Sequence, residues 1–415
     1  MKQATILLGR ALVSVVVLGA GGMGQAGGFR VASHDAEATA RGEAFAATAD
    51  NPSAIYYNPA GITQLSGHNV RAGVYGLYID ATYNDRFDNR KDLHPVPQLF
   101  YTFTPERLPL SFGLGLYAPY GLSSEWPEDT GFRTVAIEGD LRYGTVNPVV
   151  AWQVLPTLSL GAGPTLNYSE LKLRQGILLP MAGSDSFQFK GDDVFAGFNA
   201  GVLWKAHPQL QFGISYRSET TARYEGHTSA YGLLPPDFAM PFEFRQDASG
   251  RLVFPQHLVV GISFRPTPNW NFEVNVDWTD WDRLKTLPIN QAAAVPPLFP
   301  QELEVPLHWE SSFYYEFGVT RRLSEAWLVS AGYIYNENSV PDATYNPLVA
   351  DLNRHFISLG AAHRTGALDL SVAYQFGYGP ARTVSGSLPS VAGQTADGEF
   401  SYLSHALSLS LGLRF

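Results

Sequence analysis

This 415-residue sequence has no cysteine and little charge. The lack of cysteine excludes disulfides, thiolate metal sites and thiol nucleophiles. Only 16% of the residues are charged, and the net charge of −10 disfavours nucleic acid as a partner, because phosphate binding needs clustered lysine and arginine. The sequence also lacks a Gly-x-Ser-x-Gly motif, a phosphate-binding loop and a metal-spaced histidine pair. We therefore expect no enzyme activity, no cofactor and no metal site.

Beyond its first 26 residues, the chain lacks an apolar run of the roughly 20 residues that a membrane-spanning helix needs. The first 26 residues are typical of a secretory signal peptide. Lys2 and Arg10 precede a short apolar run over residues 11–20, and Ala26 follows as a small residue at the expected cleavage point. An exported chain without a spanning helix is either released or built as a closed barrel.

What the chain does have is aromatic residues (13%) and a long alternation of apolar and polar positions. From about residue 69 to the end the alternation has a period of two, which indicates strands. In the clearest segment one face carries Trp270, Phe272, Val274, Val276 and Trp278. A single strand of this kind fits a soluble sandwich or a membrane barrel equally well, so the whole set must decide.

Fourteen such segments are present: 69–83, 95–105, 110–122, 140–153, 158–173, 193–206, 209–224, 251–266, 269–283, 309–322, 326–338, 354–364, 367–379 and 400–415. Six tight connections alternate strictly with seven long ones. The long ones are 84–94, 123–139, 174–192, 225–250, 284–308, 339–353 and 380–399. An even strand number with short turns on one side and long loops on the other predicts an all-β fold, a 14-stranded antiparallel transmembrane β-barrel with both ends in the periplasm.

The two faces of these segments support the barrel. Charges opposite the apolar stripes would be costly in a dry core but are tolerated in a lumen; they are Lys205, Arg217, Arg223, Arg265, Glu316 and Asp369. Tryptophans near strand ends predict two interfacial girdles, with Trp152, Trp204, Trp270 and Trp327 beside the tight turns and Trp278 and Trp309 towards the long loops. The last segment alternates up to a terminal Phe415, as expected for a closing strand that the barrel-assembly machinery recognises.

Residues 27–68 do not alternate. They are rich in alanine and glycine, contain Asn-Pro breaks, and are too few to form an independent core. Apolar residues such as Phe29, Phe45 and Ile55 need burial, so we expect a hatch that plugs the lumen. The expected organisation is a signal peptide (1–26), a hatch (27–68) and a barrel (69–415).

Several stretches resemble the FadL/TodX family of outer-membrane transporters for hydrophobic compounds. The hatch contains AIYYNPAGI (54–62), and the later stretches, in family order, are LSFGLGLYAPYGLSSEW (110–126), FEVNVDWTDWDRLKTL (272–287), LSEAWLVSAGYIYNENSVPD (323–342) and DLNRHFISLGAAHR (351–364). The likeness covers essentially the whole mature chain. It implies a 14-stranded barrel, which agrees with the independent strand count.

The resemblance also implies functional residues. The hatch motif is Asn58, Pro59 and Ala60, and it is expected to face a side opening where Ala118, Pro119, Tyr120 and Gly121 break the third strand. Substrate would dock at the third and fourth long loops, which are unusually apolar; the candidate residues there are Ile177, Leu178, Leu179, Met181, Leu233, Leu234 and Phe238. Arg174 is a candidate for holding a carboxylate. Glu310 stands where fatty-acid-transporting members carry a lysine, so we expect either a neutral hydrocarbon or aromatic cargo, or another cation that holds the carboxylate.

The expected function is passive uptake of fatty acids or hydrocarbons through the outer membrane, with lateral release beside the third strand. A general aqueous porin would share the barrel but not the hatch or the apolar loops. An outer-membrane hydrolase would need a catalytic constellation that the sequence does not offer. The expected partners are a hydrophobic small molecule, outer-membrane lipid and lipopolysaccharide, and the barrel-assembly machinery; we expect a monomer that binds no nucleic acid.

Overall fold

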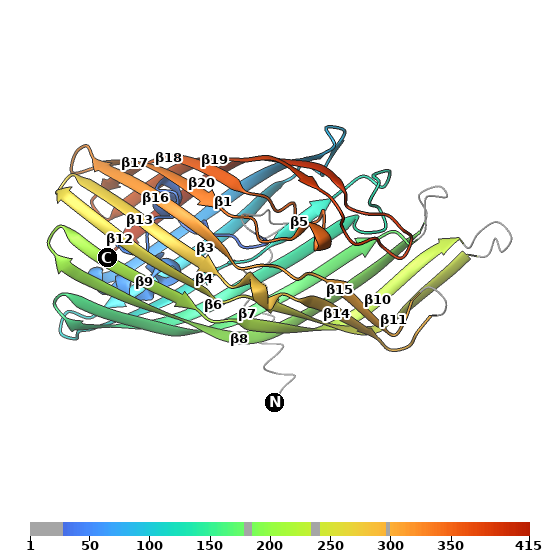
Figure 1. Ribbon diagram of the computed structural model, residues 1–415. Helices are drawn as coiled ribbons and strands as arrows, with labels where there is room; N and C mark the ends of the chain where they lie inside the picture. Colours follow the sequence, from blue (N-terminus) through green and yellow to red (C-terminus); the bar gives the residue numbers. More distant parts are fainter. Residues whose placement is uncertain (1–27, 178–184, 234–240, 296–298) are drawn as a thin grey trace, which may run out of the picture.

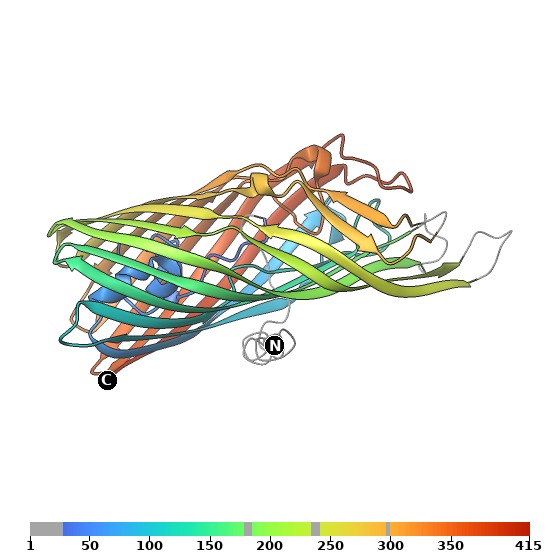
Figure 2. The same cartoon turned by 90° about the horizontal axis from the view of Figure 1, so that it is seen from below.

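The computed structural model describes residues 28–177, 185–233, 241–295 and 299–415, and its strands form a closed antiparallel barrel of fourteen strands (Figures 1 and 2). Closure is made by the first and last strands, which pair from Asn69↔Arg414 to Tyr83↔Phe400. The fold class predicted from the alternation is therefore confirmed. The expected signal peptide lies outside the described residues.

Nine of the fourteen barrel strands are continuous: β1 (Gly67–Tyr83), β3 (Leu93–Thr104), β6 (Glu138–Leu155), β7 (Leu158–Gln175), β8 (Ser186–His207), β17 (Trp327–Asn336), β18 (Arg354–Thr365), β19 (Leu368–Val384) and β20 (Gly398–Arg414). The other five, the third and the seventh to tenth, are each interrupted and built from two segments: β4 (Leu110–Tyr117) with β5 (Leu122–Glu125), β9 (Leu210–Arg217) with β10 (Thr220–Leu233), β11 (Pro241–Phe254) with β12 (His257–Thr267), β13 (Trp270–Thr279) with β14 (Thr286–Gln291), and β15 (Glu302–Pro306) with β16 (Ser312–Arg322). A two-residue strand, β2 (Phe87–Asp88), adds to the end of β1.

The alternation places apolar side chains outside and small polar ones inside. In β20, Leu409 and Leu411 are 45% and 42% exposed, whereas Ser408 is fully buried on the lumen side. Trp204 and Trp327, both beside tight turns, are also exposed. The outer surface therefore suits lipid contact, as an outer-membrane barrel requires.

The interruptions change which residues face the lumen. Arg217 is buried inside at the end of β9, but Ser218 and Glu219 break the alternation, and Arg223 is then exposed on the outside of β10. The expectation that Arg223 faces the lumen was wrong, because one added residue reverses every later side chain. Trp309, expected in the outer girdle, lies in the interruption of the tenth strand and is 2% exposed.

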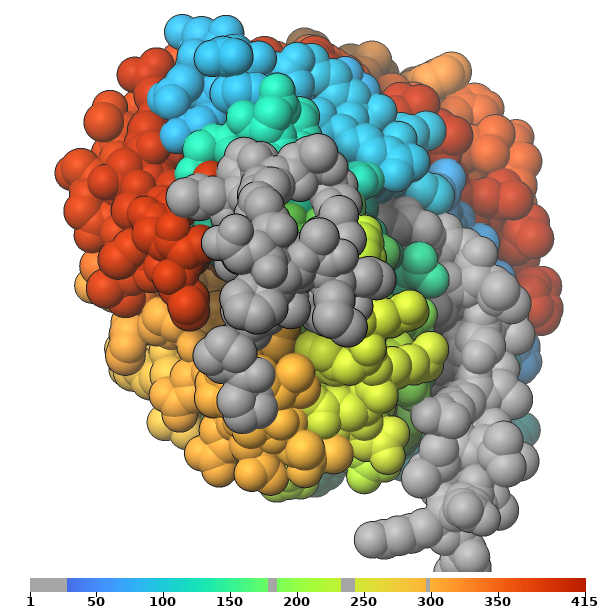
Figure 3. Space-filling model, turned by 90° about the vertical axis from the view of Figure 1, so that its right-hand side faces the viewer, coloured from blue at the N-terminus to red at the C-terminus, as the bar shows by residue number. Residues whose placement is uncertain are grey.

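Two of the long loops are largely strand. The expected loop 225–250 is a hairpin in which β10 and β11 pair from Thr220↔Phe254 to Leu233↔Pro241. The expected loop 284–308 contains β14 and β15, which also pair. The β10–β11 hairpin extends the wall well beyond the rest of the barrel (Figure 1). Viewed from that end, segments from early, middle and late parts of the chain lie around the rim (Figure 3).

Residues 28–66 lie inside the barrel, close to the tight-turn end (Figure 2), and we call them the hatch. They form three short helical turns: α2 (Ala36–Ala40), α3 (Ala54–Tyr57) and the 3-10 helix η1 (Pro59–Gln64). The fit to the wall depends on glycine: a Cβ on Gly332 of β17 would lie 2.0 Å from the backbone nitrogen of Gly42. In the part of the chain that the structure describes, no helix is long and apolar enough to cross a membrane.

Candidate functional site

The third strand is interrupted where the sequence predicts. β4 ends at Tyr117 and β5 begins at Leu122, and residues 118–121 between them are all buried. β3 pairs with β4 only from Leu99↔Leu116 to Phe103↔Phe112, while β5 pairs only with β6. Among the described residues, positions 93–98 of β3 therefore have no ladder partner on the side of the third strand. The ladder between the second and third strands is interrupted there, and we call this unpaired stretch of β3 with residues 118–121 the open seam.

The second strand is adapted to this seam by two prolines. Pro95 and Pro97 lie in the part of β3 that pairs with β1 alone, opposite Gly76 and Val74. Backbone groups of successive strand residues point to opposite sides, and a proline cannot donate to a ladder. The two prolines are thus accommodated where their backbone faces the open edge, the usual place for proline in a sheet. This signal of alternate prolines is readable from the sequence, but the expected mechanism used only the third strand.

The backbone of the interruption is paired instead with the start of the hatch. We call residues 28–32 the arm. Val31 N–H donates to the Pro119 carbonyl and Gly121 N–H to the Phe29 carbonyl, both at 2.9 Å. Arg30 and Tyr120 form an antiparallel bridge between these bonds. The arm thus acts as a short inner strand that closes the seam from the lumen side.

Aromatic side chains hold the arm in place. The Phe29 ring lies 5.0 Å from Trp281, 5.5 Å from Trp309 and 5.8 Å from Phe254. These three residues lie at the interruptions of the ninth, tenth and eighth strands. Gly28 precedes Phe29 with φ of +60°, and a Cβ there would lie 2.7 Å from Trp281. The arm therefore contacts four of the five interrupted strands, the third, eighth, ninth and tenth, at their interruptions.

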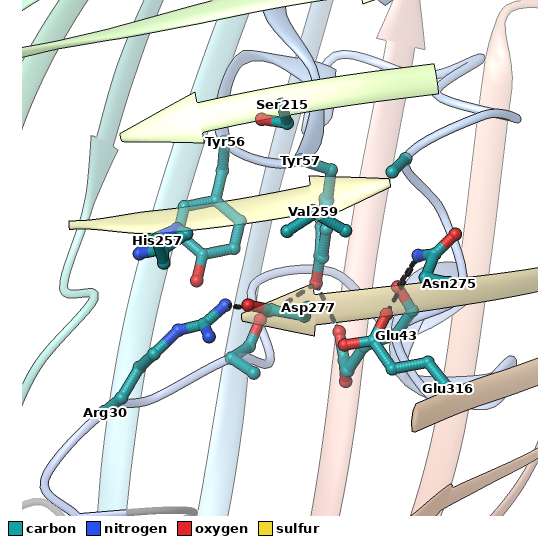
Figure 4. Close-up of a pocket in the computed structure, with 12 residues that line it drawn as sticks. Arg30, Glu43, Tyr56, Tyr57, Ser215, His257, Val259, Asn275, Asp277 and Glu316 are labelled. Atoms are coloured by element: carbon teal, nitrogen blue, oxygen red, sulfur yellow. Dashed lines mark hydrogen bonds and ion pairs between the residues drawn. The ribbon is translucent and has the colours of Figure 1, made fainter. Parts of the chain in front are cut away.

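A buried ion pair also holds the arm in place. Arg30 Nη2 lies 2.5 Å from Asp277 Oδ2, and both side chains are almost fully buried (Figure 4). Asn275 Nδ2 donates to Glu316 Oε2 at 2.8 Å on the adjacent strand. Glu43 of the hatch approaches the same region, and burial raises the pKa of its carboxyl to about 7.

The rest of the hatch is bonded to the wall more extensively than the arm. Glu273 of β13 forms an ion pair with Arg41 at 3.3 Å and accepts from the backbone N–H groups of Ala47 and Thr48 at 2.8 and 2.9 Å. A second buried pair joins Arg71 of β1 to Asp35. Breaking such buried pairs one partner at a time is costly. The hatch behind the arm is therefore firmly attached.

The hatch motif takes part in this attachment. Asn58 Nδ2 donates to the carbonyls of Val202 (3.0 Å) and Ala46 (2.7 Å), and Asn58 Oδ1 caps η1 by accepting from Ala60 N–H at 3.2 Å. Pro59 lies against Gly161 of β7. The motif's hydrogen bonds and closest wall contacts are with β7 and β8, so it is the arm, and not the motif as expected, that lies against the open seam.

The apolar outer loops meet in one cluster beyond the barrel. Phe187, Ala230 and Phe299 are buried together, and Ile177 packs against them. The rings of Phe187 and Phe299 stack at 4.8 Å with 18° between their planes. Leu233 ends β10; the other predicted docking residues, Leu178, Leu179, Met181, Leu234 and Phe238, lie outside the described residues. The contribution of Phe299, from the fifth long loop, was not predicted.

The two charged positions singled out by the sequence are not free lumen charges. Arg174 forms ion pairs with Glu138, Glu128 and Glu125 at 3.0, 3.2 and 3.3 Å. Glu310 is exposed beside the buried Trp309. Arg174 is thus already neutralised by carboxylates, and the carboxylate of Glu310 is directed to solvent.

Comparison with known proteins agrees with this architecture. The family described as "Outer membrane protein transport protein (OMPP1/FadL/TodX)" matches residues 17–415. A long-chain fatty acid transport protein of Escherichia coli is 21% identical over 373 residues, covering 80% of this chain and 82% of that protein.

Two solved structures share the fold. A Pseudomonas aeruginosa FadL homologue has a TM-score of 0.84 at 20% identity and covers 94% of this chain and 100% of its own. The Ralstonia pickettii toluene transporter TbuX has a TM-score of 0.72 at 15% identity, with coverages of 92% and 98%. With its barrel, its hatch and the family match over nearly its whole length, this chain belongs to the OMPP1/FadL/TodX family of outer-membrane transport proteins.

Proposed function

We propose that this protein mediates passive uptake of hydrophobic molecules, which dock at the outer-loop cluster and leave sideways between the second and third strands. The relatives' names, a fatty acid transporter and a toluene transporter, define the range of cargo. The observation that carries the proposal is the open seam whose backbone is paired with the arm. Cargo that displaces the arm reaches the lipid without crossing the periplasmic end of the barrel.

The unequal attachment of the hatch supports sideways release. The hatch beyond the arm is held by buried ion pairs to β1 and β13, and by close packing against wall glycines. The arm is held by two backbone hydrogen bonds to the third strand, by the ion pair of Arg30 with Asp277 and its hydrogen bond to Thr279, and by the packing of Phe29. Moving the arm therefore disrupts fewer buried interactions than expelling the hatch.

A general aqueous porin is the main alternative function. The hatch occupies the lumen near the tight-turn end, where a porin needs an open water path. We expect single-channel conductance close to that of an empty bilayer. We also propose that the protein works as a monomer in contact with outer-membrane lipid and lipopolysaccharide.

The proposal is tested by restoring the missing ladder. Replacing Pro95 and Pro97 by threonine and Pro119 by valine supplies three N–H donors and raises β-propensity on both edges of the seam. We expect a folded barrel that binds a fluorescent fatty acid or hydrocarbon outside but no longer delivers it. The matched control is Pro164→Val, a strand proline remote from the seam, which should transport normally. Wild-type uptake by a variant whose structure shows a complete ladder would exclude sideways release.

A further inference from the structure

Arg217, at the end of β9, is a buried lumen arginine with no carboxylate beside it. It is 6% exposed, and within the described residues it forms no ion pair. Five other described arginines are buried, and each lies 3.9 Å or less from a carboxylate; they are Arg30, Arg41, Arg71, Arg133 and Arg354. A buried charge is costly without a counter-charge. The lumen therefore holds one positive charge that an anion from outside the protein would stabilise.

The side chain of Arg217 lies between two tyrosines beside the open seam. Its guanidinium carbon is 5.1 Å from the ring centre of Tyr56 and 5.2 Å from that of Tyr117. Tyr117 ends β4 and directly precedes residues 118–121 of the open seam. Tyr56 belongs to the hatch and donates to the carbonyl of Val31 in the arm at 3.3 Å. Arg217 is thus in contact with one neighbour of the seam and with one of the arm.

One edge of the guanidinium has no hydrogen-bond acceptor. Nη1 of Arg217 donates to Tyr117 Oη at 2.9 Å, but Nε and Nη2 have no partner in the protein. These two nitrogens share one edge of the planar group, and a carboxylate accepts parallel hydrogen bonds from such an edge. A hydrocarbon accepts none, and a single hydroxyl cannot accept both in this geometry. The free edge therefore matches a carboxylate.

Movement of the arm opens the approach to Arg217. A small cavity of about 20 Å³ is lined by Ser215, two residues before Arg217 on β9, and by His257, its ladder neighbour on β12 (Figure 4). Arg30 of the arm forms another part of the lining. The cavity is too small for cargo while the arm is in place, since a volume of this size holds about one water molecule. It becomes wider when Arg30 leaves.

We propose that Arg217 binds the carboxylate of an anionic amphiphile, such as a long-chain fatty acid, through Nε and Nη2 when the cargo reaches the open seam. Arg217 then supplies the cation that neither Glu310 nor the neutralised Arg174 provides. The carboxylate leaves water without remaining uncompensated, so fatty acids are preferred over neutral hydrocarbons. This inference deepens the proposed uptake of hydrophobic molecules and rests on it, but binding at Arg217 does not depend on the direction in which cargo leaves.

The test compares two cargoes that differ only in their head group, a long-chain fatty acid and the primary alcohol of the same chain length. Arg217→Gln should lower uptake of the acid at limiting concentration on the order of tenfold, the effect of losing hydrogen bonds to a charged group, and leave uptake of the alcohol unchanged. Arg217→Lys keeps the charge without the two-nitrogen edge and should recover part of the loss. Arg223→Gln removes an exposed arginine from the outside of β10 and is the matched control, which should change neither uptake.

Two results would overturn the role of Arg217. Equal losses of acid and alcohol uptake would show that the side chain only supports the packing of Tyr56 and Tyr117. An unchanged preference for the acid in a folded, heat-modifiable Arg217→Gln barrel would show that the carboxylate binds elsewhere. If that variant does not fold, Arg217→Lys provides the same comparison, and its preference for the acid must be weaker than that of the wild type.

A crystal structure with bound fatty acid tests the site without relying on transport. We expect the carboxylate oxygens within hydrogen-bond distance of Nε and Nη2 of Arg217, and a carboxylate held by another cation would contradict the inference. An acid-specific loss in Arg217→Gln, combined with wild-type uptake by the ladder-restored variant, would retain the site and reject sideways release. If wild-type protein takes up neither compound, the proposed function fails, and the bound structure alone decides the site.

Discussion

Glu43 is a buried hatch carboxyl whose protonation makes the stability of the folded protein depend on pH. It accepts from Ser33 Oγ at 2.7 Å and Tyr57 Oη at 2.6 Å, and burial raises the pKa of this carboxyl from 4.5 to about 7. In the unfolded chain Glu43 ionises at its ordinary pKa, so over this range the folded protein holds a proton that the unfolded chain has released. Stability is therefore highest below the unfolded pKa and is lost as pH rises through the folded one.

We expect wild-type thermal stability to fall between about pH 5 and about pH 7, by up to about 3 kcal/mol from this group. Glu43→Gln cannot ionise, so its stability should lack this part of the pH slope. Thermal unfolding of both proteins in detergent across this range measures the difference. Parallel pH profiles would show that Glu43 is not the group responsible.

The residues of the site were predictable to different degrees. Pro119 and Gly121 locate the interruption directly, because both residue types disfavour a strand interior. Arg30 and Asp277 could not be paired from the sequence, since nothing local relates the arm to the ninth strand. Trp309 was misplaced because the alternation was extended through an interruption that reverses it.

At the level of strands and loops, strand number and order followed from the alternation, and strand ends did not. The hairpin of β10 and β11 was expected to be a loop because the alternation was taken to end at residue 224 and to resume at residue 251. Paired strands satisfy their own backbone N–H and C=O groups, whether or not lipid surrounds them. Strand pairing can therefore continue beyond the membrane-spanning part of the barrel. The break at Ser218–Glu219 leaves no strong sequence signal, and it reverses the faces of the residues that follow.

We expect the outer-loop cluster to take part in docking of the cargo. Phe299→Asp introduces a charge into the stack with Phe187 and should separate the fifth loop from the third. We expect uptake at limiting cargo concentration to fall severalfold while the barrel still folds. Val391→Asp is the control, because Val391 is fully exposed in the seventh long loop. Equal uptake by the two variants, both surface-exposed and heat-modifiable, would remove the cluster from the docking step.

We expect the end of the last strand to contribute to assembly of the barrel. Phe415 exchanges backbone hydrogen bonds with His68 at 3.0 Å in both directions, and their rings stack at 5.5 Å. Deleting Phe415 removes the end of the apolar stripe and the last bonds of barrel closure. We expect export to continue while insertion into the outer membrane slows. Pulse-labelling that shows the wild-type insertion rate would contradict this role of Phe415.

At the scale of the whole molecule, the barrel and the hatch contribute different properties. The barrel is built from neighbouring strands in chain order, which is why one sequence pattern predicts it. The hatch contacts wall residues far away along the chain, and it completes a wall that is open at the third strand. On the proposed route, the arm moves during transport while the rest of the hatch stays in place.

The most direct test locks each part in turn with an engineered disulfide in this cysteine-free chain. Val31→Cys with Pro119→Cys joins the arm to the interruption, where the two backbones share a hydrogen bond. Ala40→Cys with Ala373→Cys joins the hatch to β19, where the two alanines pack together. Both pairs lie at neighbouring backbone positions, as a disulfide requires. We predict that the oxidised arm lock binds cargo but stops uptake until it is reduced, and that the oxidised hatch lock transports normally. Uptake that survives the arm lock and stops with the hatch lock would contradict the account, because cargo would then pass the hatch into the periplasm.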